Sequence, residues 1–557
     1  MNCTHLQNTL SKALILAALS LAVGTAHAQT YSVVYDFGMN VGDPATPVNS
    51  GMIAQGRDGS LYSSTSAGGT NPGYGATYSI TPDGSLTLLD SFGPSGGSLP
   101  NGGLTLGGDG NFYGTTYGGG NPGPGTIFQM TPSGGLTTWY NFTNGSDGEY
   151  PDAPPIEGTD GNFYGTSCSA CNSGGNGAIY KITPAKKFTV LYAFDGTHGQ
   201  GPMDPLIQGT DGNFYGTTAF GGKNGLGVVF KITPAGGLTV IYNFDGTHGS
   251  IPSGPLLQGS NGNFYGTTGG GGSFSGGVIF KLTPAGKYTV LHNLNLSTDG
   301  GGPVAGLVQA TDGNFYGATS QNGPGTTNCP SGCGTLFKIT PSGVFSVIHS
   351  FDVTDGEIPQ TTMIQHTNGV LYGTASEGGM ASMCPFSSCG VLYSVNIGAA
   401  PFVTFVGTPA AKVGKTVELL GQGLTGLSGV SFNSTPATFT FVSDTYITAT
   451  VPNGATSGSV TVTTPGGTLT SSKTFRVTPQ IKSFAPPSGV VGSEVVITGV
   501  SLTQTSKVTF GGVAAAFTVN SDTQVTATVP TGAKTGKIVI TTPGGTATSA
   551  TDFTVTT

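Results

Sequence analysis

The chain has 557 residues, a length that exceeds one ordinary hydrophobic core and implies several domains or a repeat array. Glycine contributes 97 residues and charged residues only 8%, which excludes long surface helices and favours short strands joined by tight turns. The formal net charge is −8 at pH 7. The chain therefore lacks the basic surface of a nucleic-acid-binding protein, and we expect no nucleic-acid partner.

The first 28 residues have the pattern of a secretion signal. Lys12 precedes an apolar run over residues 13–23, and the small-residue site Ala26-His27-Ala28 follows. We expect cleavage before Gln29 and export to the cell surface, the medium or a bacterial periplasm. The apolar run is too short for an anchor and no later run of about 18 apolar residues follows, so we expect no membrane span.

A short motif recurs seven times after the signal. Its clearest form is TDGNFYGTT at residues 210–218, and looser copies begin at residues 57 and 367. The period is 50 or 51 residues with one longer final step. The copies are marked by their shared tyrosines, Tyr62, Tyr113, Tyr164, Tyr215, Tyr265, Tyr316 and Tyr372.

Each repeat contains four strand-like pieces, as the fourth copy shows at residues 205–208, 213–218, 228–233 and 238–244. Asp-Gly or Asn-Gly turns join the first two pieces, and we interpret them as hairpin geometry. The pieces are apolar on both faces, which is typical of sheets covered on both sides, such as the blades of a β-propeller. We interpret the repeated tyrosines and phenylalanines as core residues.

A count of the strands predicts a closed ring. Residues 31–37 match the fourth strand of a repeat, whereas the seventh copy stops after its third strand at residues 390–395. Every strand type occurs seven times only if the two ends share one blade. We therefore predict a seven-bladed β-propeller over residues 29–398, with the amino-terminal strand closing the last blade.

The pattern xxGGxxGxIFKITPxGxxTVLYxFDG resembles the GloVer-type tandem repeat of secreted bacterial proteins, over residues 31–397. This resemblance implies a repeat architecture and names no activity.

A second period of roughly 78 residues begins after residue 400, because residues 450–468 return as 528–546. Alternating apolar residues predict two sandwich modules, residues 399–478 and 479–557. Residues 481–489, 492–499 and the turn Phe510-Gly511-Gly512 make the second resemble an IPT/TIG domain, while Phe432-Asn433-Ser434 departs from that pattern in the first. The resemblance implies immunoglobulin-like folds used as spacers or interaction modules.

Six cysteines follow the expected cleavage site and fall in three close pairs. Because the protein is expected to be exported, we favour local disulfides. The alternative is a metal site, but the unequal spacings and the absence of nearby histidines argue against it. The pairs are Cys168 with Cys171, Cys329 with Cys333, and Cys384 with Cys389.

The loops between the second and third strands and after the fourth strand are expected to open on one face of the ring. They carry the cysteine pairs and two Phe-Asp-Gly-Thr-His-Gly sequences with Asp195, His198, Asp245 and His248. Variable loops on a rigid scaffold often bind ligands, so we hypothesise that this face of a monomeric adhesion protein binds an extracellular glycan or a surface protein. For His198 and His248, we favour solvated loop residues over catalytic bases or metal ligands.

No catalytic motif supports an enzyme, since GxSxG, HExxH, a phosphate loop and a dinucleotide fingerprint are absent in usable context. The alternative function is a polysaccharide hydrolase or lyase whose carboxylates converge at the ring axis. Acidic side chains gathered at the channel mouth would favour it. No calcium loop of the DxDxDG type occurs, so we expect no metal and no cofactor.

Overall fold

The computed structural model describes residues 29–47, 52–94, 96–121, 123–143, 145, 147–168, 175–380 and 389–557. Every regular element within these ranges is a β-strand, so the all-β prediction is confirmed. The expected secretion signal lies outside them. No helix in the described ranges has the length and apolar character that crossing a membrane requires.

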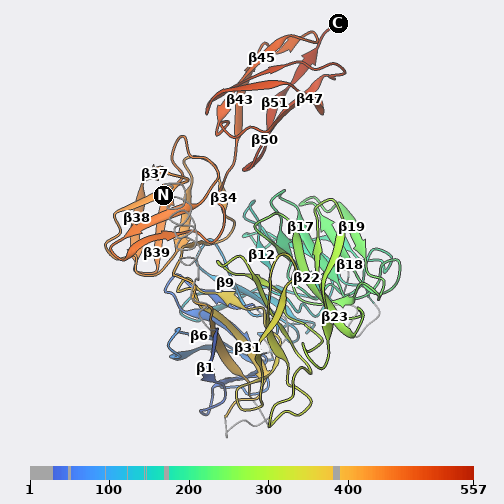
Figure 1. The fold of residues 1–557 in the computed structure, drawn as a ribbon, viewed down its shortest axis with the longest axis vertical. Coiled ribbons are helices and arrows are strands. Elements are labelled where there is room, and N and C mark those ends of the chain that lie inside the picture. The colour runs from blue at the N-terminus through green and yellow to red at the C-terminus, as the bar shows by residue number, and fades with distance from the viewer. Residues whose placement is uncertain are drawn as a thin grey trace, which may run out of the picture.

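The repeats fold into antiparallel sheets, which we number 1 to 7 in chain order (Figure 1). Sheets 1 to 3 contain, in this order, β3 (Ala54–Gln55), β4 (Leu61–Thr65), β6 (Ala76–Ile80) and β7 (Leu86–Ser91); β8 (Thr105–Leu106), β9 (Phe112–Thr116), β10 (Thr126–Met130) and β11 (Leu136–Asn141); β12 (Ile156–Glu157), β13 (Phe163–Ser167), β14 (Ala178–Ile182) and β15 (Phe188–Ala193). A separate small pair consists of β2 (Pro44–Ala45) and β5 (Ala67–Gly68).

Sheets 4 to 6 have the same order, with one extra strand at the inner end of sheet 5. They contain β16 (Ile207–Gln208), β17 (Phe214–Thr218), β18 (Val228–Ile232) and β19 (Leu238–Asn243); β20 (Ser250–Pro252), β21 (Leu257–Gln258), β22 (Phe264–Gly270), β23 (Ser275–Leu282) and β24 (Tyr288–Asn295); β25 (Val308–Gln309), β26 (Phe315–Thr319), β27 (Thr335–Ile339) and β28 (Phe345–Ser350).

Sheet 7 joins the two ends of the repeat region. It contains β29 (Glu357–Pro359), β30 (Ile364–Gln365), β31 (Leu371–Glu377) and β32 (Val391–Asn396), and its outer strand is β1 (Thr30–Asp36). The register of β1 on β32 runs antiparallel from Thr30 opposite Asn396 to Asp36 opposite Val391. The predicted pairing between the amino-terminal strand and the unfinished last repeat is therefore confirmed.

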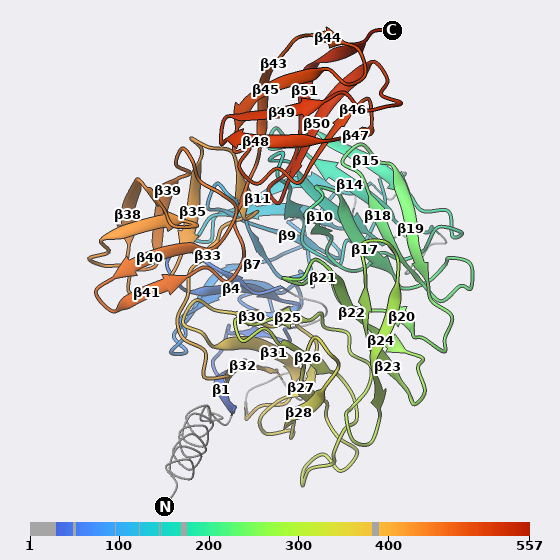
Figure 2. The same cartoon turned by 45° about the horizontal axis from the view of Figure 1, so that its top comes forward.

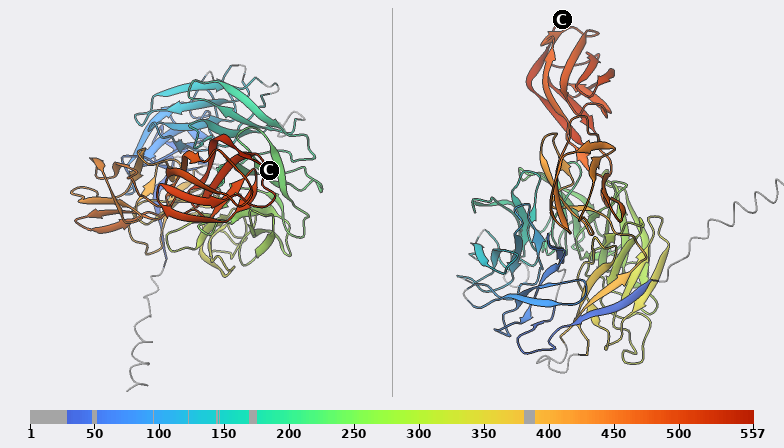
Figure 3. Two further views of the ribbon diagram at one scale, coloured as in Figure 1. Left: turned by 90° about the horizontal axis from the view of Figure 1, so that it is seen from above. Right: turned by 90° about the vertical axis from the view of Figure 1, so that its left-hand side faces the viewer.

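Apolar clusters join each sheet to the next. Six clusters link consecutive sheets from 1 to 7. A further cluster contains Leu61 and Tyr78 of sheet 1 together with Tyr372 and Leu392 of sheet 7. The contacts thus form a closed cycle, and Figures 2 and 3 show the sheets following one another around a common axis.

The repeated tyrosine explains the motif physically. In sheet 3, the Tyr164 hydroxyl donates to Asp160 of its own turn at 2.7 Å, and the ring stacks on Phe214 of sheet 4 with centroids 4.0 Å apart. All seven tyrosines make the hydroxyl contact to their turn Asp or Asn. The interpretations as hairpin turn and core residue are confirmed, and the motif also joins neighbouring sheets.

A second repeated contact links the sheets at their first strands. Gln208 of sheet 4 accepts a hydrogen bond from the Thr159 amide of sheet 3 at 2.9 Å, and Gln258, Gln309 and Gln365 repeat it. Gln55 closes the series by accepting from the Thr367 amide of sheet 7 at 3.0 Å. We call these residues the glutamine belt.

Two immunoglobulin-like modules follow, each with its own apolar core. The first pairs β33 (Thr404–Phe405), β35 (Thr416–Leu420), β39 (Tyr446–Thr450) and β38 (Phe439–Ser443) in one sheet, β37 (Thr435–Ala437), β36 (Gly429–Phe432), β40 (Val460–Thr464) and β41 (Gly467–Thr470) in another, and β34 (Ala410–Ala411) with β42 (Arg476–Val477). The second pairs β43 (Gln480–Ala485), β45 (Glu494–Val500), β49 (Gln524–Thr528) and β48 (Phe517–Ser521), opposite β44 (Ser488–Gly489), β51 (Gly545–Val555), β50 (Gly536–Thr542), β46 (Lys507–Phe510) and β47 (Val513–Ala515).

The first module rests on the ring. We call the side with the two tight turns of each sheet the turn face, and the opposite side the loop face. Arg57, in the first turn of sheet 1, forms an ion pair with Glu418, and the Thr445 hydroxyl donates to the Arg57 carbonyl at 2.7 Å. Arg476 donates to the Thr210 carbonyl in the first turn of sheet 4 at 2.6 Å. The module therefore lies on the turn face (Figure 3).

Replacing Gln55 by leucine tests the glutamine belt where the ring closes. Both hydrogen bonds between Gln55 and Thr367 are buried, so Gln55→Leu leaves the Thr367 amide without its acceptor and is expected to cost about 1–3 kcal/mol of unfolding free energy. Gln208→Leu is the matched control, because its contacts to Thr159 are exposed and a smaller loss is expected. Urea unfolding measures both, and equal losses would contradict a special role for the closing contact.

Candidate functional site

The loop face carries most of the exposed apolar side chains of the ring. Among the described residues, nine of the ten large exposed apolar side chains in the ring lie in the segments that form the loop face, eight of them in loops and Ile251 in the short strand β20, and one, Val344, lies in a tight turn. The nine are Met39, Val41, Tyr74, Leu99, Phe220, Ile251, Phe274, Leu296 and Met380. Variable loops on a rigid scaffold are a common place for ligand binding, and these loops also expose apolar side chains, so this face is the candidate site.

The four candidate residues form two equivalent Asp–His pairs. His198 Nδ1 lies 2.7 Å from an Asp195 carboxylate oxygen, and the His198 amide donates to the other oxygen at 2.8 Å. Asp245 and His248 repeat both contacts, each at 2.7 Å. These side chains are about half exposed. Each pair is closed within one loop, and no hydrogen bond joins one pair to the other in the described residues.

Electrostatics keep both carboxylates charged. The hydrogen bond from the His198 amide, followed by that from its side chain, lowers the pKa of Asp195. For Asp245, partial burial opposes the shift, but the side-chain and amide hydrogen bonds of His248 prevail and lower its pKa. Each loop therefore presents an ionised carboxylate near neutral pH, which accepts hydrogen bonds from hydroxyl groups.

The structure adds an aromatic residue to each pair. Phe220 exchanges two backbone hydrogen bonds with Gln200, at 2.8 and 2.9 Å, so the loop of sheet 4 lies against the Asp195 loop. The loop that carries Phe274 bonds to the Asp245 loop through the Gly272 amide and the Gly246 carbonyl at 2.9 Å. The phenylalanines are 40% and 54% exposed. Two similar units thus lie on the neighbouring sheets 4 and 5.

The two histidines of the fourth strands, His292 and His349, are packing residues. His292 stacks on Phe345 with centroids 4.0 Å apart, and His349 stacks on Tyr31 at 3.7 Å. Each also contacts a carboxylate of the following loop, Asp299 and Asp355 respectively. The single tryptophan, Trp139, is also buried, with 8% of its surface exposed.

The cysteines form a local disulfide where the structure describes both partners. Cys329 and Cys333 are bonded, as predicted. Glu357 lies beside these sulfur atoms, but their bond leaves no thiolate to ligate a metal. Cys168 and Cys389 are also disulfide-bonded, whereas Cys171 and Cys384 lie outside the described residues.

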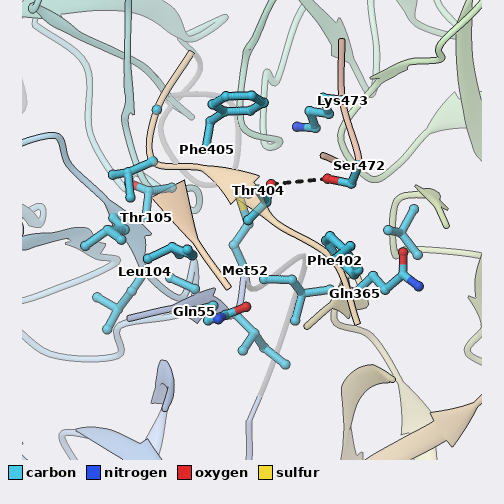
Figure 4. A pocket seen from close by; sticks show the side chains of 18 of the residues that line it. Met52, Gln55, Leu104, Thr105, Gln365, Phe402, Thr404, Phe405, Ser472 and Lys473 are labelled. Carbon is cyan, nitrogen blue, oxygen red and sulfur yellow. Dashed lines mark hydrogen bonds between the residues drawn. The ribbon is translucent and has the colours of Figure 1, made fainter. Parts of the chain in front are cut away.

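A cavity lies between the first strands of the ring and the first module. Gln55, Leu104 and Gln365 line one side of a cavity of about 300 Å³, and Phe405 and Lys473 of the first module line the other (Figure 4). Thr404 and Ser472 bond across this module at 3.3 Å. The module therefore covers these first strands on the turn face, which the sequence did not predict.

Two carboxyl groups of neighbouring sheets interact electrostatically. Asp152 and Asp204 precede the first strands of sheets 3 and 4. Burial raises the pKa of Asp152 to about 6 and that of Asp204 to about 7, and the charge of Asp152 adds to the rise at Asp204. Asp204 also accepts hydrogen bonds from the Gly254 amide at 2.9 Å and from Thr217 at 3.2 Å. Sequence reasoning missed this pair, because a single Asp in each repeat carries no motif.

Comparison with known families identifies the repeats. The Gloeobacter/Verrucomicrobia repeat matches residues 23–210 and 155–385, which together span more than half of the chain. The chain belongs to this repeat family. The IPT/TIG domain matches residues 401–477 and 479–555, so both C-terminal modules are IPT/TIG domains, including the first with its divergent turn. Both resemblances seen in the sequence are confirmed.

Solved structures share only remote similarity with this repeat protein. The surface glycan-binding protein PbSGBP-B from Prevotella bryantii is 20% identical, with 28% of this chain and 39% of that chain covered and a TM-score of 0.21. SGBP-B from a xyloglucan utilization locus in Bacteroides uniformis is 22% identical over 27% and 48%, with a TM-score of 0.15. The chain thus spans less than half of either protein.

A fungal alcohol oxidase of the AA5 family is 14% identical, with 81% of this chain and 100% of that chain covered and a TM-score of 0.43. A comparison with curated protein sequences finds no match.

The raised pKa of Asp204 predicts how stability depends on pH. The folded state holds a proton on Asp204 that the unfolded state releases above its ordinary pKa of 3.8, so this residue favours the unfolded state increasingly from about pH 4 to about pH 7. Asp204→Asn, which stays neutral, is expected to lose less stability than the parent over this range. Urea unfolding at pH 4, 5.5 and 7 measures the difference, and parallel pH profiles of the two proteins would contradict the assignment.

Proposed function

We propose that the seven sheets are the blades of a closed β-propeller and that the protein is an exported binding protein whose loop face holds a glycan. The IPT/TIG domains would serve as spacers or interaction modules on the opposite face. The local Cys329–Cys333 disulfide supports an oxidising location such as the cell surface or the medium.

The observation that carries this proposal is the concentration of exposed apolar side chains on the loop face. A sugar ring has one face of C–H groups, which packs on an aromatic ring, and a rim of hydroxyls, which needs hydrogen-bond partners. The two units over sheets 4 and 5 offer both. Phe220 and Phe274 supply the aromatic rings, and Asp195 and Asp245 supply charged acceptors.

The turn face is less accessible to an extended glycan than the loop face. IPT/TIG domain 1 contacts first turns from sheets 1, 4 and 7, so much of the turn face is already occupied. An extended glycan finds an open surface on the loop face instead. A surface protein is the alternative ligand for that face.

A second candidate function is polysaccharide cleavage by Asp152 and Asp204. Their raised pKa values favour it, because a protonated carboxyl beside an ionised one is the arrangement that glycoside hydrolysis requires. The hydrogen bonds from Gly254 and Thr217 support a structural role for Asp204 equally well, since the first joins sheets 4 and 5. We therefore favour binding without catalysis.

The double variant Phe220→Ala and Phe274→Ala tests the loop-face site. On a glycan and cell-wall polymer array, the parent is expected to bind a polysaccharide, and the variant is expected to lose about tenfold or more in affinity because two stacking contacts are removed. Val344→Ala, an exposed apolar residue on the turn face, is the control and should bind as the parent does.

Two results would contradict the proposal. One is equal binding by the double variant, and the other is capture of a surface protein through these residues with no glycan bound. Sugar release measured on the same polymers separates the second candidate: reducing ends that appear with the parent and vanish with Asp152→Asn and Asp204→Asn would establish cleavage.

A further inference from the structure

A second cavity lies on the turn face, where the ring and both IPT/TIG domains meet. It encloses about 560 Å³, within the range of about 300–1,000 Å³ typical of ligand pockets. We call it the junction pocket. It is lined by Thr159, Gly209, Thr210, Asp211, Gly212, Ala410, Ala411, Lys412, Lys415, Arg476, Thr478, Gly544 and Gly545.

The walls of the junction pocket are fixed to one another. IPT/TIG domain 1 is bonded to the ring through Arg476 and Thr210 at 2.6 Å. The two IPT/TIG domains are joined by Gln504, which accepts from the Ser457 amide at 2.7 Å and donates to the Ser457 carbonyl at 3.1 Å. The pocket is therefore bounded by directly bonded parts.

Three cations face the junction pocket in a chain that is acidic overall. Lys412 and Lys415 belong to one turn, whose ends are joined by the Lys415 amide and the Lys412 carbonyl at 3.1 Å. Arg476 is brought beside this turn because β34 and β42 pair in parallel, with Ala410 opposite Arg476. Among the described residues, no carboxylate lies within ion-pair distance of these three cations.

The acidic residue of the pocket is already satisfied. The Asp211 carboxylate accepts hydrogen bonds from the amide and side chain of Asn213 and from the Tyr215 hydroxyl. Burial lowers the pKa of Arg476, and Asp211 offsets only part of this effect. An added anion would therefore stabilise the guanidinium and the two ammonium groups.

We propose that the junction pocket is a binding site for an acidic saccharide, whose carboxylate or sulfate group would pair with Lys412, Lys415 and Arg476. Three threonines and four glycines also line the pocket, and no aromatic residue does. This composition favours a charged, polar ligand. A long nucleic acid is disfavoured because the negative charge of the rest of the chain would repel it. The site is independent of the loop-face site.

Titration calorimetry on the full chain tests this proposal with trigalacturonate, a sulfated galactotriose and neutral galactotriose. At least one acidic trisaccharide is expected to bind, more weakly at high salt, and the neutral one is not. The two acidic probes show whether carboxylate or sulfate is preferred. Lys412→Gln with Lys415→Gln is expected to reduce the affinity about tenfold or more.

Lys482→Gln with Lys534→Gln is the matched control, because it changes the net charge equally with lysines that do not line the pocket. Absence of binding by both acidic probes, equal binding of the neutral probe, or equal losses in the two double variants would overturn the proposal. The Phe220→Ala, Phe274→Ala variant should bind the acidic probe normally. If this variant loses affinity for the acidic probe, acidic saccharides bind on the loop face and the proposal is overturned. If it binds the acidic probe normally but the parent binds no polysaccharide on the glycan array, only the loop-face proposal is refuted.

Discussion

The structure depends on the pairing of β1 with β32, which turns a linear series of repeats into a closed ring. Without it, sheet 7 would expose β32 as an open edge and sheet 1 would lose its neighbour. The seam is reinforced by Gln55, which bonds to Thr367, and by His366, whose Nε2 donates to the Gly59 carbonyl at 2.9 Å. His366 is fully buried, and burial lowers its pKa, so it holds this contact as a neutral side chain.

The two faces of the ring have different roles. The turn face becomes a regular platform of first turns, and IPT/TIG domain 1 spans it from sheets 7 and 1 to sheet 4. The loop face keeps its variable loops, its exposed aromatic residues and the Asp–His pairs. Both proposed binding sites depend on this arrangement. Each combines residues from separate segments of the sequence, which only the folded ring brings together.

The sequence predicted what repeats locally. The seven tyrosines marked the sheets, and the unmatched strands at residues 31–37 and 390–395 predicted the seam, because strand counting needs no side-chain geometry. The glutamine belt was detectable as a repeated residue at the end of the first strand. Leu106 interrupts it, and Glu157 replaces a glutamine but accepts the equivalent hydrogen bond from the Gly108 amide. The docking of Glu418 on Arg57 and the approach of Asp152 to Asp204 were not predictable, since each depends on packing between separate segments.

A crosslink within the seam tests closure most directly. Ser32 and Ser394 are opposite each other in the β1–β32 register, and directly opposed residues in antiparallel strands have the Cα separation that a disulfide needs. Under oxidising conditions, the Ser32→Cys, Ser394→Cys variant should form this bond within one chain, detected by mass spectrometry of its linked peptides. Reduced cysteines at both positions in a folded, monomeric protein would contradict the closed ring.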